Sequence, residues 1–168
     1  ASSPLDWSAT FEFRASTLKR FNPLPYLLQL LLEVHGLRSQ SGALYSVLSE
    51  LYSNALEHGV LGLDSRLKRD ATGFARYYRE RGERLVQLEE GFIRVHLRVV
   101  PAERGGRLTL QVEDSGTGFD ADTILALPLV GNELYGRGLG LVRQLTEQAS
   151  WSRDGRIASV EFSWEGMA

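Results

Sequence analysis

Apolar residues at every second position predict strands in three parts of the chain. The first strand is indicated by Leu5, Trp7, Ala9, Phe11 and Phe13. The middle of the chain alternates over residues 92–100 and 108–112, with Gly105 and Gly106 between the two segments. Residues 151–164 alternate again around Asp154 and Gly155. Turn glycines between alternating segments are typical of hairpins, so we expect two of them.

Between the strands, apolar residues recur at the spacing of helices. One helix is predicted over residues 22–34, with a proline near its first turn, a glycine after its end and a leucine-rich buried face. That face comprises Leu24, Leu27, Leu28, Leu31 and Leu32. A second helix is expected to be capped by Ser39 or Ser41 and to end near Gly59. The last two are predicted over residues 120–127 and 138–148.

Strands that come in adjacent pairs, separated by helices, favour an α+β fold over a doubly wound parallel sheet. We expect a two-layer sandwich in which a mixed, largely antiparallel sheet carries helices on one face. A length of 168 residues, 43% of them hydrophobic, suits a single domain over residues 1–168. The chain begins with Ala1 rather than methionine, so we expect either a piece of a longer protein or a processed or tagged chain.

Residues 61–91 form an unusual, charged segment between the second helix and the middle strands. Its aromatic and leucine residues have broadly helical spacing, which predicts a helix over about residues 72–90: Phe74, Tyr77, Tyr78, Leu85 and Leu88. Gly82 costs about 1 kcal/mol relative to alanine and is a candidate interruption. The segment is interpreted either as a solvated helix packed by its aromatics or as a surface for a partner or second subunit.

Composition excludes several classes of function. With 19 basic and 21 acidic residues, the net charge of −2 does not point to nucleic acid or a membrane surface. The longest apolar run, residues 27–32, is far shorter than the roughly 20 residues that span a membrane. The absence of cysteine suits a reducing cytoplasm. The three histidines, His35, His58 and His96, are too scattered to suggest zinc.

The strongest candidate for chemistry is the segment ELYSNALEHG, residues 50–59. On a helix, its polar residues Glu50, Asn54 and His58 form a stripe beside a buried apolar one. The apolar stripe comprises Leu44, Leu48, Leu51 and Ala55. A polar stripe at the edge of a core is accessible to a ligand, although the same spacing also occurs on solvated helix faces.

Two glycine-rich segments follow. Asp114 ends an apolar strand and precedes Ser-Gly-Thr-Gly, so its carboxylate could accept a hydrogen bond from the exocyclic amine of adenine, or the segment could be a simple turn. Residues 136–141, GRGLGL, lead into a helix, and such an entry directs amide groups and the helix dipole at an anion such as phosphate. No Gly-Lys-Ser/Thr follows, so this segment is not a P-loop.

In this order, the three segments resemble the N, G1 and G2 boxes of the GHKL ATPase superfamily, which includes DNA gyrase, MutL and histidine kinases. The resemblance covers about residues 7–164 and implies the Bergerat α/β sandwich with bound ATP and Mg²⁺. It implies that Asn54 holds the magnesium and that Asp114 binds the adenine amine. The remaining residues that it places around the nucleotide, in supporting or phosphate-flanking roles, are His58, Gly116, Gly118, Gly136, Arg137, Gly138, Leu139 and Gly140, with a short lid over residues 119–135.

Glu50, four residues before Asn54, makes the chain look most like the anti-sigma serine kinases of bacterial partner-switching systems. That resemblance implies that Glu50 accepts or orients the proton of a serine on a STAS-domain anti-anti-sigma protein. A sigma factor or an anti-sigma factor and a homodimer are further implied partners, without direct contact to nucleic acid or membrane. Residues 61–91 depart from the compact kinases and resemble larger regulators that fuse such a module to receiver and phosphatase domains. Two alternatives stay open: a non-catalytic module that sequesters partners under control of ATP, and the catalytic domain of a histidine kinase.

Overall fold

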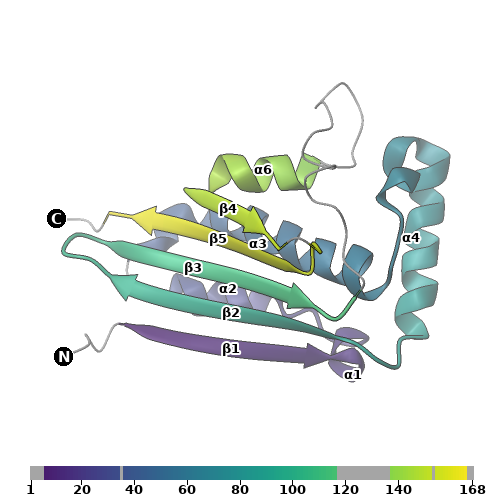
Figure 1. Ribbon diagram of the computed structural model, residues 1–168, viewed down its shortest axis with the longest axis horizontal. Helices are drawn as coiled ribbons and strands as arrows, with labels where there is room; N and C mark the ends of the chain where they lie inside the picture. Colours follow the sequence, from purple (N-terminus) through teal and green to yellow (C-terminus); the bar gives the residue numbers. More distant parts are fainter. Residues whose placement is uncertain (1–5, 35, 117–136, 153, 166–168) are drawn as a thin grey trace.

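The computed structural model describes residues 6–34, 36–116, 137–152 and 154–165, which form one sheet covered by helices (Figure 1). The sheet has five strands in the order β1-β2-β3-β5-β4. Their bounds are β1 Trp7–Arg14, β2 Phe92–Pro101, β3 Gly106–Asp114, β4 Gln148–Trp151 and β5 Ile157–Trp164. Every pairing between these strands is antiparallel. The predicted α+β sandwich is therefore confirmed, and no parallel pair occurs among the strands that are described.

Helices α2, α3 and α6 lie on one side of the sheet, and α4 stands at the end where β1 and β3 finish (Figure 1). The α-helices are α1 Ala15–Leu18, α2 Leu24–Leu32, α3 Ser41–Asn54, α4 Ala71–Val86 and α6 Arg137–Leu145. Leucines of α2 and α3 pack against the inward side chains of the central strands, with Leu27, Val47, Val95 and Leu110 fully buried between the layers. This core fixes α3 against β3. None of the helices in the described ranges combines the length and apolar character needed to cross a membrane.

The entry to α3 differs from the prediction. A short 3-10 turn, η1 Leu37–Gln40, leads directly into the helix. Ser39 therefore lies inside this turn and donates its hydroxyl hydrogen to the carbonyl oxygen of Gly36, at 2.9 Å, while Ser41 is the first residue of α3. The prediction that Ser39 or Ser41 caps α3 is wrong, because the preceding turn holds both serines in helical positions where neither side chain reaches the free amides.

The end of α3 is also unusual. The α-helix stops at Asn54 and continues as a wider π-turn, η2 Ala55–Val60. The amide of Leu61 bonds to the carbonyl oxygen of Leu56 at 2.8 Å, which is the five-residue spacing of a π-turn. Such turns are frequent at functional sites. The predicted end near Gly59 is close to the observed one, but the last residues are rotated relative to an α-helix.

The segment 61–91 contains a 3-10 turn, η3 Ser65–Arg69, followed by α4. The N-terminus of α4 is capped by Asp70, whose carboxylate accepts a hydrogen bond from the amide of Gly73 at 2.7 Å. Gly82 does not interrupt the helix; it is exposed and has open space beside it. Tyr77, by contrast, is completely buried. The segment is thus attached to the domain by an aromatic residue, as the first of the two interpretations requires.

Candidate functional site

The fold brings the first two candidate segments together. Asn54 is the last residue of α3, and Asp114 is the last residue of β3. Both line a small cavity between the helix and the sheet. The rest of its lining comes from neighbouring turns of α3, β3 and the β4–β5 hairpin: Leu51, Ala55, Val112, Trp151, Gly155, Arg156 and Ala158.

Asn54 is half-buried, and its side-chain amide nitrogen is fully buried. Within the described ranges, that nitrogen has no hydrogen-bond partner. A buried polar atom without a partner is costly, and natural proteins keep very few of them unless a ligand, ion or water completes the site. Asn54 therefore has the properties expected of a ligand-binding residue.

Asp114 is almost completely buried, with 3% of its surface exposed. Burial raises the pKa of its carboxyl group to about 6, although a hydrogen bond from the amide of Gly116, at 2.8 Å, and the nearby Arg156 act in the opposite direction. Arg156 itself is paired with Asp154, at 2.8 Å. No cation forms an ion pair with Asp114 in the part of the chain that is described. The carboxylate thus retains capacity to accept further hydrogen bonds.

Two glycines allow the end of the π-turn to lie directly against Asp114. A Cβ atom on Gly59 would overlap the Asp114 carboxylate, and one on Gly116 would overlap the carbonyl oxygen of Gly59. Such a close approach of backbone to side chain is possible only with glycine at both positions. Residues from the first and second candidate segments therefore form one continuous wall.

The third candidate segment joins them through Glu50. Gly138 lies in the first turn of α6, and a Cβ atom there would overlap the Glu50 carboxylate. Glu50 is half-buried, and burial raises its pKa. In the same helix Arg137 is the first residue, Leu139 is buried and Gly140 is half-buried. A carboxylate beside a helix N-terminus is favourably placed, and the same end of the helix is suited to binding phosphate.

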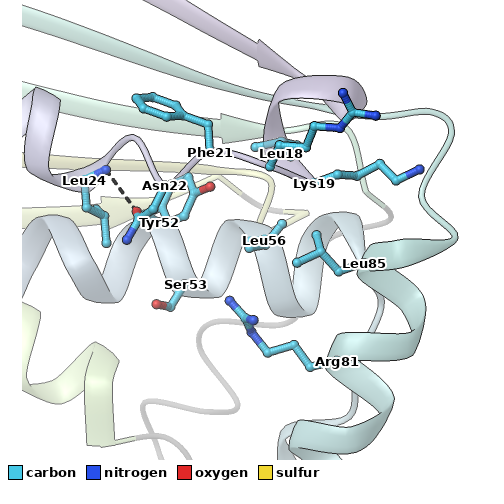
Figure 2. A pocket seen from close by; sticks show the side chains of 11 residues that line it. Leu18, Lys19, Phe21, Asn22, Leu24, Tyr52, Ser53, Leu56, Arg81 and Leu85 are labelled. Carbon is cyan, nitrogen blue, oxygen red and sulfur yellow. Dashed lines mark hydrogen bonds between the residues drawn. The ribbon is translucent and has the colours of Figure 1, made fainter.

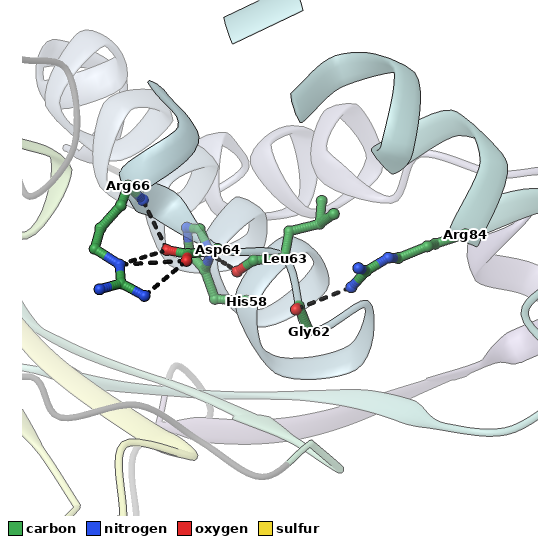
Figure 3. Close-up of polar contacts among 6 residues, drawn as sticks. All are labelled: His58, Gly62, Leu63, Asp64, Arg66 and Arg84. Atoms are coloured by element: carbon green, nitrogen blue, oxygen red, sulfur yellow. Dashed lines mark hydrogen bonds and ion pairs between the residues drawn. The ribbon is translucent and has the colours of Figure 1, made fainter. Parts of the chain in front are cut away.

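Several predicted residues have other positions. Gly118, Gly136, the lid over residues 119–135 and the helix over 120–127 lie outside the described residues. His58 is half-buried, and its Nδ1 atom lies 2.9 Å from the carbonyl oxygen of Leu63, to which it donates a hydrogen bond (Figure 3). Burial lowers the pKa of His58, which favours the neutral ring. Its ring bonds to Leu63 and contacts the ring of Tyr77, both in residues 61–91, so the geometry favours the packing role.

Sequence reasoning missed Glu57, which is 6% exposed. It accepts a hydrogen bond from the Tyr77 hydroxyl at 2.5 Å. Its two carboxylate oxygens also lie 3.6 Å from the Lys68 ammonium group and 3.4 Å from the Arg81 guanidinium group. On a regular helix, Glu57 would not be distinguished from a solvated residue. The π-turn changes the rotation per residue, and this turns Glu57 inward.

Other contacts of the segment 61–91 lie at the end of the π-turn and at the residues directly after it. Arg84 donates hydrogen bonds from one nitrogen to the carbonyl oxygens of Leu61, at 2.8 Å, and Gly62, at 3.0 Å. Figure 3 shows Arg84 reaching Gly62 on one side of the turn and His58 contacting Leu63 on the other. The segment 61–91 therefore holds in place the turn that carries Gly59 to Asp114.

The sequence model of a family described as histidine kinase-, DNA gyrase B- and HSP90-like ATPases matches residues 39–164. That range covers most of the chain and includes all three candidate segments. The chain belongs to this family. Domains of the family bind ATP, usually with Mg²⁺. No curated protein matches the chain.

The described residues fit this ligand. The partnerless amide of Asn54, the buried carboxylate of Asp114 and the glycine wall beside it leave polar atoms directed at one cavity. No group of three or more acidic, histidine or cysteine side chains suited to a metal occurs in the described ranges. Magnesium would accordingly depend on the oxygen of Asn54 together with the phosphates, as is usual for this ion.

Proposed function

We propose that the chain is an ATP-dependent protein serine kinase of the anti-sigma type, a partner-switching module that phosphorylates a STAS-domain anti-anti-sigma protein. The observation that carries the proposal is the position of Glu50. It lies one helical turn before Asn54, beside the first turn of α6, in a half-buried environment that raises its pKa. A carboxylate with a raised pKa is a better proton acceptor for a hydroxyl group near neutral pH.

The roles of the side chains follow from this arrangement. Glu50 would accept the proton of the serine hydroxyl while the serine oxygen bonds to the terminal phosphorus of ATP, the bond from that phosphorus to the bridging oxygen breaks, and ADP leaves. Asn54 holds the metal, and Asp114 accepts the hydrogen bond of the adenine amine. Bound ATP and Mg²⁺ supply the phosphoryl group and offset its negative charge. The contacts of Glu57 fix the π-turn, and the fixed turn keeps Asn54 and Asp114 close to each other.

The partner provides the serine. A STAS-domain anti-anti-sigma protein is the proposed substrate, and a sigma factor or an anti-sigma factor is the proposed second partner that the switch releases or retains. A homodimer is the proposed assembly. These proposals rest on the resemblance of the three segments and on Glu50.

The test is transfer of labelled phosphate from ATP to a STAS-domain protein, followed by identification of the modified residue. We expect acid-stable label on serine, and a rate at least 100-fold lower for Glu50→Gln, which keeps the shape of the side chain but removes the base. Glu33→Gln is the matched control, because Glu33 is exposed, and it should keep the wild-type rate. Label undiminished in Glu50→Gln would refute the role of Glu50.

The same assay separates the alternatives. Acid-labile label would indicate a histidine kinase instead. Partner binding that depends on ATP, survives Glu50→Gln and gives no phosphorylated product would indicate a module that only sequesters partners. Calorimetry with Asn54→Ala tests the step before catalysis: we expect magnesium-dependent ATP binding to be lost, and wild-type affinity would contradict the pocket itself.

A further inference from the structure

A second cavity of about 350 Å³ lies away from the candidate nucleotide site, between the α1–α2 connection, α3 and α4 (Figure 2). Its lining shares no residue with the first cavity. The end of α3 and the start of the π-turn η2 separate the two: Tyr52, Ser53 and Leu56 line the second cavity, whereas Leu51, Asn54 and Ala55 line the first. The volume falls at the lower end of the roughly 300–1,000 Å³ typical of small-molecule sites.

The charged side chains that line this cavity are all positive. Lys19 and Arg20 from the α1–α2 connection and Arg81 from α4 all line it, and no Asp or Glu is among the described residues of its lining. Arg81 pairs with Glu57 at 3.4 Å. Lys19 and Arg20 form no ion pair in the described ranges, and both are exposed. The cavity therefore presents at least two uncompensated positive charges to an incoming anion.

The hydroxyl group of Tyr52 adds a second observation. Tyr52 is 5% exposed, and burial raises its pKa to about 12, so the phenol stays protonated. Tyr52 lines the cavity, and its hydroxyl makes no hydrogen bond in the part of the chain that is described, so it is free to donate one to a ligand. The Nε atom of Arg81 is buried and already faces the Glu57 carboxylate at 3.4 Å, so Arg81 contributes to the cavity as a paired cation.

The remaining lining is mostly apolar, with Asn22 and Ser53 as its two further polar residues. Leu18 lies opposite Leu56 and Leu85, and Phe21 and Leu24 complete the apolar part of the lining (Figure 2). Phe21 is 48% exposed, which is unusual for so large an apolar side chain beside a cavity. Apolar walls with a few convergent donors describe a site for a molecule that has an apolar body and an anionic group.

We propose that this cavity binds a small amphipathic anion, with its carboxylate, sulfonate or phosphate group held by Lys19, Arg20 and the Tyr52 hydroxyl and its apolar body between α1, α3 and α4. The proposal is independent of the kinase proposal, because none of its residues belongs to the nucleotide site.

The test is a fluorescence titration with the amphipathic anion 8-anilinonaphthalene-1-sulfonate, compared with its neutral counterpart N-phenyl-1-naphthylamine. We expect one saturable site for the anion. The double variant Lys19→Gln/Arg20→Gln should bind the anion at least tenfold more weakly, while its affinity for the neutral dye should change less than twofold. Tyr52→Phe, which removes only the hydroxyl, should weaken anion binding about threefold.

Two controls make the result decisive. The variant Arg104→Gln/Arg107→Gln removes two exposed basic residues, one in the β2–β3 turn and one at the start of β3, and should bind the anion like the wild type. Saturating ATP and Mg²⁺ should not displace the dye, because the two cavities are separate. The proposal is overturned by the absence of a saturable site, by equal effects of the two double variants or by complete displacement with ATP. Circular dichroism of each variant verifies that the fold is retained.

Discussion

The two buried carboxylates among the described residues have opposite surroundings. Glu57 is held by the Tyr77 hydroxyl, Lys68 and Arg81. Asp114, buried to a similar degree, has only a backbone amide and no ion pair among the described residues, and its pKa is raised to about 6. A buried charge with a full set of partners serves structure, whereas a buried charge without them destabilises the fold and is retained for a ligand.

The largest effect should come from removing the satisfied carboxylate. Glu57→Ala leaves Lys68 and Arg81 without their counter-charge and the Tyr77 hydroxyl without its acceptor, so we expect a loss of about 3 kcal/mol in the free energy of unfolding. Urea denaturation measures it, with the exposed Glu33→Ala as control. A loss below about 0.5 kcal/mol, the size expected for a surface site, would remove the distinction between the two carboxylates.

A smaller loss is expected when only one partner of Glu57 is changed. Tyr77→Phe keeps the buried ring and deletes a single hydrogen bond to a charged acceptor, which should cost about 1.5 kcal/mol. The neighbouring Tyr78 is 49% exposed, so Tyr78→Phe is the matched control and should leave stability unchanged within error. Equal effects of the two changes would show that the Glu57 contact adds nothing.

Asp114→Asn should have the opposite sign. At pH 7.5 the wild-type carboxylate is ionised and buried, so the neutral amide should stabilise the ATP-free protein by about 1 kcal/mol. The same change should weaken ATP binding at least tenfold, because the amide replaces an acceptor with a mixed donor and acceptor. Denaturation and calorimetry on one preparation measure both. Destabilisation together with unchanged ATP affinity would identify Asp114 as a structural residue.

The pH dependence sharpens this prediction. Because the folded-state pKa of Asp114, about 6, lies above the ordinary value, the protonated form is favoured by folding. Its contribution is fully present below about pH 4 and is lost as the pH rises through 6. The advantage of Asp114→Asn over the wild type should therefore be about 1 kcal/mol at pH 7.5 and should largely disappear at pH 4.5. If the stability difference between Asp114→Asn and the wild type does not change with pH, the carboxyl group of Asp114 does not have a raised pKa.

Much of the fold could be predicted because its signals are local. Alternation of apolar residues located the strands, and helical spacing placed Leu44, Leu48 and Leu51 on the buried face of α3. The approach of Asp114 to the end of that helix followed from the order of the three segments and is reproduced by the structure.

The remainder depends on backbone geometry that a regular period does not represent. The 3-10 turn before α3 removed the predicted serine cap, and the π-turn after it rotated Glu57 into the protein. The ion-pair and hydrogen-bond partners of Glu57 lie 11 to 24 positions later in the sequence, across an irregular connection. No periodic pattern in 61–91 indicates which of its basic residues turns inward.

The mutual contact of Gly59, Asp114 and Gly116 has a consequence for the evolution and engineering of this domain. Any side chain at position 59 displaces the acid at 114, and any side chain at 116 collides with the backbone at 59. These positions cannot drift independently, although more than 50 residues separate the first from the others. A chimera that exchanges the helix or the strand keeps the wall of this pocket only if glycine stands at both positions 59 and 116.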